Sequence, residues 1–154
     1  MSFKNKRTGK TISQELQQSL IKYKALVSVR LPEKAELILM KTVQSSFDQE
    51  KYQSKSGSKW DPRKSTDKSA GHRKLLVKSG DLRRSFETFQ RGADVGIGTD
   101  IEYAKVHNEG LKAGRGAGFQ MPKRQFMPKP GETNSQIEKE LDDFMNKEMD
   151  KIFR

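Results

Sequence analysis

The chain has 154 residues, of which 32% are hydrophobic and 33% charged, with no cysteine and a formal net charge of +11. This length suits one domain with a modest core. The lack of cysteine excludes disulfides, thiolate nucleophiles and cysteine metal sites. No apolar run reaches the roughly 18 residues that a membrane-spanning helix needs. We therefore expect a soluble protein without a membrane partner, whose basic residues 1–10 form a flexible N-terminus rather than a signal peptide.

The first part of the chain predicts two helices. Apolar residues recur every three or four positions over residues 11–29, and Thr11 and Gln14 are placed as a capping box. A second apolar stripe runs from Pro32 to Phe47, and proline suits the first turn of a helix because its missing N–H costs little there. We expect a break between the two helices near residues 30–32.

Two further segments differ sharply in composition. Residues 53–74 are almost wholly serine, lysine and small polar residues, with Trp60 as the one large apolar group. Such a segment cannot offset the entropy of ordering, so we expect a mobile basic loop that is pinned to the core at Trp60 and orders on assembly. Residues 134–153 predict a C-terminal helix, because their apolar residues form one face.

Between these segments the pattern changes to short strands and turns. Asp81 suits the start of a helical turn, while a strand is favoured for the residues up to Phe89, and the alternation over 93–99 predicts a strand paired with it. A helical turn is expected over 100–109, and the glycine-rich residues 111–118 predict a hairpin tip rather than a phosphate-binding loop. Three prolines keep residues 120–130 extended.

These elements predict one α+β domain over residues 1–154. We expect its two N-terminal helices and its C-terminal helix to pack on a small, mainly antiparallel sheet formed by about residues 75–99 and 119–128.

The stretch YAKVHNEG, residues 103–110, is the strongest candidate for an active site. His107 and Glu109 diverge by about 200° on a helix, and their spacing matches no metal-ligand motif. Packing is the favoured interpretation, in which Tyr103, Val106 and His107 pack against the domain and Gly110 ends the turn in a left-handed conformation. We therefore expect no catalytic residue, no metal and no cofactor.

The charge is unevenly distributed along the chain. Residues 55–91 carry eleven basic and four acidic side chains, whereas residues 131–154 carry four basic and seven acidic ones. A basic loop can contact either a polyanion or an acidic protein surface. Contacts to nucleic acid would be non-specific, so a nucleic-acid-binding module is the alternative function. The candidate contact residues are Lys55, Lys59, Arg63, Lys64, Lys68, Arg73 and Lys74.

Five segments occur in a fixed order: SFDQE, KW, LLVKSGDLRRSF, VGIGTDIEYAKVHNEG and MPKRQFM. The series resembles the phage virion morphogenesis family, the tail completion proteins of Mu-like and P2-like phages and their prophage relatives. The resemblance covers about residues 40–130. Glu109 stands where the family commonly has an aromatic residue, and Gln125 where it commonly has proline. The structural motif residues carried over from the family pattern are Trp60, Gly80, Leu82, Tyr103, His107, Gly110, Arg124 and Phe126.

The resemblance implies a structural assembly protein without catalytic residues. It implies a role at the neck or tail end, where the tail is completed so that it can join a filled head. The implied partners are other neck or tail proteins and further copies in a homo-oligomeric ring, with non-specific contact to DNA in the lumen. The implied location is the host cytoplasm during assembly and the virion afterwards. We further expect Tyr103 and Phe126 to be touching, buried anchors, with Arg124 as a hydrogen-bonding cation beside them.

Overall fold

The computed structural model describes residues 7–55, 57–63, 74–92, 94–129, 131–132 and 134–154. Its elements in chain order are three helical segments, α1 (Ile12–Ala25), η1 (Leu26–Arg30) and α2 (Leu31–Gln49), then α3 (Asp81–Arg84), β1 (Glu87–Arg91), β2 (Asp94–Gly98), α4 (Tyr103–Glu109), β3 (Lys112–Ala113), β4 (Phe119–Gln120) and α5 (Ser135–Phe153). The predicted α+β class is confirmed.

The N-terminal helix begins as its sequence predicts. The hydroxyl of Thr11 accepts a hydrogen bond from the backbone N–H of Gln14, and the Gln14 side chain accepts one from the N–H of Thr11, at 3.3 and 3.0 Å. This reciprocal capping box satisfies two backbone donors that a helix start otherwise leaves unpaired.

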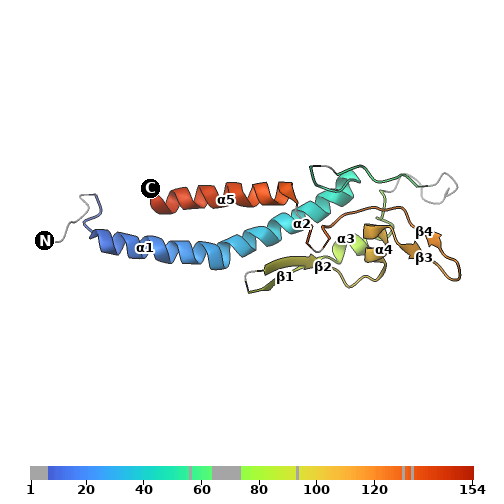
Figure 1. The fold of residues 1–154 in the computed structure, drawn as a ribbon, viewed down its shortest axis with the longest axis horizontal. Coiled ribbons are helices and arrows are strands. Elements are labelled where there is room, and N and C mark those ends of the chain that lie inside the picture. The colour runs from blue at the N-terminus through green and yellow to red at the C-terminus, as the bar shows by residue number, and fades with distance from the viewer. Residues whose placement is uncertain (1–6, 56, 64–73, 93, 130, 133) are drawn as a thin grey trace.

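The expected break near residues 30–32 is wrong, because the helix continues through this region as the π-helical turn η1 (Figure 1). The N–H of Leu31 donates to the carbonyl of Leu26, five residues earlier. A π turn is wider than an α turn and accommodates a proline that would clash with the preceding turn of a regular helix. Pro32 therefore bends one long helix instead of separating two.

The C-terminal helix α5 lies along the N-terminal helices and runs antiparallel to them (Figure 1). Asn134 caps its start, since its side-chain oxygen accepts hydrogen bonds from the N–H groups of Gln136 and Ile137. The Asn134 amide donates to the Tyr52 hydroxyl and the Gln53 carbonyl, which ties the start of α5 to the end of α2. The packing partners of α5 are thus helices rather than the expected sheet.

We call the antiparallel pair that α5 forms with the N-terminal helices the arm. Within it, Glu148 is the one buried residue of α5, at 4% exposure. Arg30 from η1 and Lys151 from α5 both form ion pairs with its carboxylate. Two hydrogen-bonded cations compensate the cost of removing one carboxylate from water. The ion pair between Arg30 and Glu148 joins α5 to the bend of the long helix.

The strands form two separate hairpins rather than the single expected sheet. β1 pairs antiparallel with β2, with Phe89 opposite Gly96, and packs on α2. β3 pairs antiparallel with β4 around the glycine-rich tip, as predicted for a hairpin. The chain after β4 stays extended but does not join β1 and β2, because its backbone bonds to α4 instead: the Arg124 N–H donates to the His107 carbonyl at 2.8 Å.

Candidate functional site

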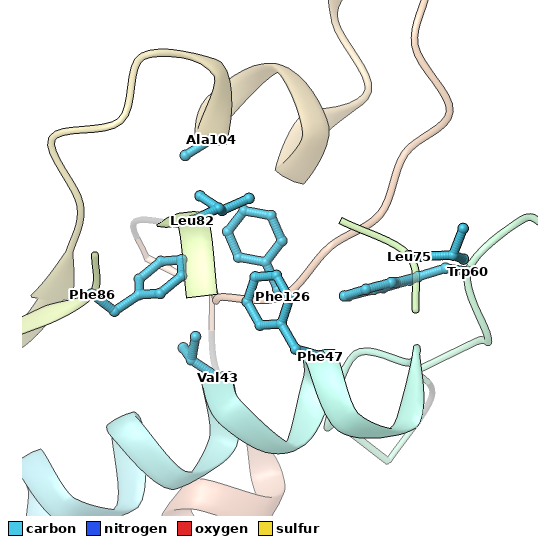
Figure 2. Close-up of a cluster of buried hydrophobic side chains, with 8 residues drawn as sticks. All are labelled: Val43, Phe47, Trp60, Leu75, Leu82, Phe86, Ala104 and Phe126. Atoms are coloured by element: carbon cyan, nitrogen blue, oxygen red, sulfur yellow. The ribbon is translucent and has the colours of Figure 1, made fainter. Parts of the chain in front are cut away.

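Three of the predicted motif residues, Trp60, Leu82 and Phe126, meet in a core between α2, α3 and α4. Phe126 is fully buried at its centre, stacked on Phe47 with ring centroids 5.2 Å apart and edge-on to Phe86 at 5.5 Å (Figure 2). Aromatic contacts of this geometry add to the free energy of burying the rings. The core residues are Val43, Phe47, Trp60, Leu75, Leu82, Phe86, Ala104 and Phe126.

Trp60 anchors the basic segment to this core, as its isolation in the sequence predicts. Its ring meets Phe47 edge-on at 5.7 Å, and its indole N–H donates to the Gln125 carbonyl at 2.7 Å. Arg124 adds a second tie, because its guanidinium donates to the carbonyls of Asp61 and Pro62 at 3.0 to 3.5 Å. The extended segment and the chain around Trp60 therefore hold each other in place.

The most consequential site residue is one that the sequence analysis did not single out. Asn108 on α4 is buried, and its side-chain oxygen accepts hydrogen bonds from the N–H groups of Phe126 and Met127, at 2.9 and 3.1 Å. An asparagine side-chain oxygen has two acceptor sites and can take both bonds at once. Asn108 takes the place of a neighbouring strand for the extended segment.

Two glycines adopt left-handed backbone conformations at the ends of the site helices. Gly110 ends α4 with φ of 69°, as expected, and a Cβ there would lie 2.8 Å from the Cβ of Lys123. Gly80 precedes α3 with φ of 83°. Both positions favour glycine because residues with a side chain are strained at such positive φ values.

Tyr103 differs from the expectation of a buried anchor. Its side chain is 48% exposed, so burial beside Phe126 is wrong. The reason is its place at the first turn of α4, where Ala104 rather than Tyr103 faces the core. Tyr103 instead packs edge-on against His107, one turn later, with ring centroids 6.0 Å apart.

A shallow pocket of about 340 Å³ lies beside this pair. It is lined by Leu76, Lys78, Ser79, Asp81, Leu82, Tyr103 and His107, so the two longest motif segments meet here. Leu76 holds a left-handed backbone with φ of 58°, which is strained for a branched apolar residue. The pocket thus combines the exposed ring of Tyr103, the apolar side chains of Leu76 and Leu82, and the opposite charges of Lys78 and Asp81.

The pocket contains serine, aspartate and histidine but not their catalytic arrangement. Ser79 donates to Asp81, and Asp81 pairs with Arg84 at 2.9 Å. The Nδ1 of His107 is buried and has no hydrogen-bond partner among the described residues. A catalytic triad needs a serine that hydrogen-bonds to the histidine and an aspartate that hydrogen-bonds to the other histidine nitrogen. In this pocket Ser79 and Asp81 bond to each other, and neither bonds to Nδ1 of His107.

Burial and the nearby Arg124 guanidinium lower the pKa of His107, which keeps its imidazole neutral near pH 7. Within the described part of the chain, no three histidine or carboxylate side chains come together in a way that could hold a metal ion. No helix in the same part is long and apolar enough to cross a membrane.

The basic residues predicted to contact a partner are separated by the structure. Lys55 and Lys59 are exposed, and Lys59 lines a polar pocket of about 290 Å³ beside Trp60 together with Lys123 and Glu132. By contrast, Lys74 forms an ion pair with Asp48 at 3.5 Å, and Arg63 donates to the Lys74 carbonyl. The remaining predicted contacts lie outside the described residues: Lys64, Lys68 and Arg73.

The model of the phage virion morphogenesis family matches residues 8–150. The chain belongs to this family. No curated protein and no solved structure matches it. The match extends well beyond residues 40–130 and includes α1 and most of α5, so the helical arm belongs to the family fold together with the aromatic core.

Membership confirms the resemblance and gives the protein its general role, which is phage virion morphogenesis. That role is structural in character and virion-associated. The site residues carried over by resemblance now have positions. Trp60, Leu82 and Phe126 lie in the aromatic core, whereas Tyr103 and His107 line the pocket on its surface.

Proposed function

We propose that this morphogenesis protein is a non-catalytic structural subunit that completes the phage tail and enables head–tail joining. Family membership over residues 8–150 is the observation that carries the proposal. The role fits a ring of identical subunits at the neck or tail end, assembled in the host cytoplasm and carried into the virion. The partners in this proposal are other neck or tail proteins.

The pocket beside Tyr103 is the proposed docking site for such a partner. The aromatic core and the Asn108 hydrogen bonds hold α4 rigidly, so Tyr103 is presented without a large ordering cost on binding. Exposed aromatic rings in a hollow with a mixed-charge rim are typical binding hot spots. Lys78 and Asp81 supply that rim.

Contact with DNA in the lumen is a second part of the proposal. Lys55 and Lys59 are exposed on the segment that Trp60 anchors, which places two cations at a fixed point of the surface. Phosphate contacts by lysines are non-specific and weaken steeply with salt. DNA affinity that does not change with salt concentration would contradict this part. DNA affinity that depends on the base sequence would also contradict it.

The test is complementation of a phage that lacks this gene, with particles examined by electron microscopy. We expect free heads and free tails without the protein, and joined particles when it is restored. Tyr103→Ala is expected to restore joining poorly while melting like wild type. The matched control is Phe119→Ala, which removes an exposed aromatic ring from β4, outside the pocket. Equal joining by both variants would remove the pocket from the proposal, and normal joining without the gene would overturn the function.

A further inference from the structure

The hairpin of β1 and β2 has an open edge. Only two residues separate Arg91 from Asp94, so this closing pair exchanges both of its backbone hydrogen bonds. Because the bonding pattern alternates along an antiparallel pair, Thr88 and Gln90 direct their N–H and C=O groups away from β2. In the described part of the chain, no backbone group outside the hairpin bonds to either residue. Such an edge can accept a further strand.

Of the two strands, β1 is the more open. Four of its five residues are exposed, whereas four of the five residues of β2 are half-buried. Ile97 of β2 packs against the aromatic core on the face of the hairpin that lies against α2 (Figure 1). Phe89, the one apolar residue of β1, lies on the opposite face and is 49% exposed. The edge of β1 is therefore the accessible one.

The exposed face of β1 presents an acid, an aromatic ring and a base in that order. Glu87, Phe89 and Arg91 occupy every second position of the strand, so they share this face, and all three are exposed. The guanidinium of Arg91 lies over the Phe89 ring, 5.6 Å from its centroid. In the described part of the chain, neither Glu87 nor Arg91 forms an ion pair. The two lie about 13 Å apart along the strand, so they cannot pair with each other.

This order of side chains is complementary to itself in an antiparallel pair. When a second β1 lies beside the first with the two Phe89 residues opposite each other, Glu87 of each copy faces Arg91 of the other. The same register lets Thr88 of each copy exchange both backbone hydrogen bonds with Gln90 of the other, which satisfies the outward groups of both strands. Sliding the strands by two residues breaks these pairings and moves Glu87 away from Arg91.

The charges favour β1 of a second copy over its β2. If β2 of a second copy lay beside β1 with the hairpin tips level, Asp94 would face Arg91, but Glu87 would face Gly98. One of the two charges would then stay without a partner. Charge complementarity between surfaces fixes both the partner and the register, and only the pairing of β1 with β1 matches both charges.

We propose that β1 of one copy pairs antiparallel with β1 of a second copy, so that the two hairpins form one four-stranded sheet. A two-stranded hairpin is only marginally stable, and a sheet of three or more strands is more stable. The contact is isologous, since the same residues of both copies form it, and it is complete with two copies. It therefore differs from the head-to-tail contacts of a ring and goes beyond the proposed role in tail joining.

Charge reversal tests the pairing by sedimentation equilibrium of the full chain. We expect wild type to dimerise with rising concentration. Glu87→Arg sets arginine opposite arginine, and Arg91→Glu sets glutamate opposite glutamate, so each variant alone is expected to stay monomeric. An equal mixture of the two variants is expected to form mixed dimers, because every arginine then faces a glutamate.

Recovery in the mixture also shows that both variants are folded. The matched control is Asp100→Arg, which makes the same change of charge at an exposed residue beyond the end of β2. This variant is expected to dimerise like wild type. A wild-type monomer at every concentration overturns the proposal, and so does a mixture that dimerises no better than its two components.

Disulfide cross-linking tests the register, since the chain has no native cysteine. The proposed pairing sets position 89 of one copy opposite position 89 of the other. Phe89→Cys, which keeps both ion pairs, is therefore expected to form a disulfide-linked dimer on oxidation. The control is Phe119→Cys on β4, where the replaced ring is 60% exposed and lies outside the hairpin of β1 and β2. Equal rates of cross-linking at the two positions would overturn the proposed register.

Discussion

The side-chain oxygen of Asn108 accepts hydrogen bonds from two successive backbone N–H groups, those of Phe126 and Met127. The backbone of Phe126, one of the two fully buried rings of the core, is therefore held by a polar side chain on α4. A backbone segment that lacks a strand partner must satisfy its buried donors elsewhere. Asn108 does so here, and this explains why an asparagine occupies a fully enclosed position.

Removing this acceptor is expected to destabilise the domain. Asn108→Ala leaves two N–H groups unpaired, one of them at the fully buried Phe126, so we expect a loss of about 2 to 4 kcal/mol in the free energy of unfolding. Urea denaturation measures the change. The control is Asn146→Ala on the exposed side of α5, which should shift the midpoint little. Equal midpoints for the two variants would contradict the role of Asn108.

Substituting alanine at Gly110 and at Gly116 separates the cost of a left-handed backbone from the cost of a steric contact. Gly110 and Gly116 have nearly equal φ values, 69° and 67°. A Cβ at Gly110 would meet Lys123, whereas a Cβ at Gly116 would meet nothing within 4 Å. We expect Gly116→Ala to cost about 1 kcal/mol from the left-handed backbone alone, and Gly110→Ala to cost at least 1 kcal/mol more. Thermal melts of both variants measure the difference, and equal losses would show that the contact with Lys123 is relieved freely.

The histidine of the pocket makes stability depend on pH. Burial, and secondly Arg124, lower the pKa of His107 below its ordinary value of 6.5. The unfolded chain therefore binds a proton at a higher pH than the folded chain does, so the free energy of unfolding falls as pH drops below about 6.5. We expect His107→Gln to lose less stability than wild type between about pH 7.5 and pH 5.5. Identical losses in the two proteins would contradict a lowered pKa.

The sequence predicted local structure better than it predicted which surfaces are covered. The capping box at Thr11, the left-handed end at Gly110 and the tie at Trp60 depend on nearby residues or on a single isolated group, and all three are confirmed. Pro32 was misread because the π turn before it depends on the packing of the whole helix, including the buried Leu26. Local sequence does not encode that packing.

The same limit applies to the apolar residues. A stripe such as that of α1 predicts a buried face, but periodicity does not say which molecule buries it. Asn108 was missed for a related reason, because its two bonds join residues 18 and 19 positions apart. Tyr103 was expected in the core because it lies in the motif, although a register difference of one residue on α4 turns Ala104 inward instead.

That difference gives the last prediction, which compares two aromatic residues of the motif. Phe126 is fully buried and Tyr103 is 48% exposed. Phe126→Ala empties the centre of the core and is expected to cost about 3 to 5 kcal/mol, a large share of the roughly 5 to 15 kcal/mol by which a domain is ordinarily stable. Tyr103→Ala removes a half-exposed ring and is expected to cost less than about 1 kcal/mol.

The measurement pairs chemical denaturation with the joining assay, so that stability and assembly are separated. Phe126→Leu is the conservative variant that keeps the protein folded, and it should retain joining because the pocket surface is unchanged. Tyr103→Ala should keep its denaturation midpoint and lose joining. If Tyr103→Ala instead unfolds as readily as Phe126→Ala, the ring supports the core and the pocket loses its exposed aromatic residue. If both folded variants join normally, Tyr103 contributes to neither stability nor docking.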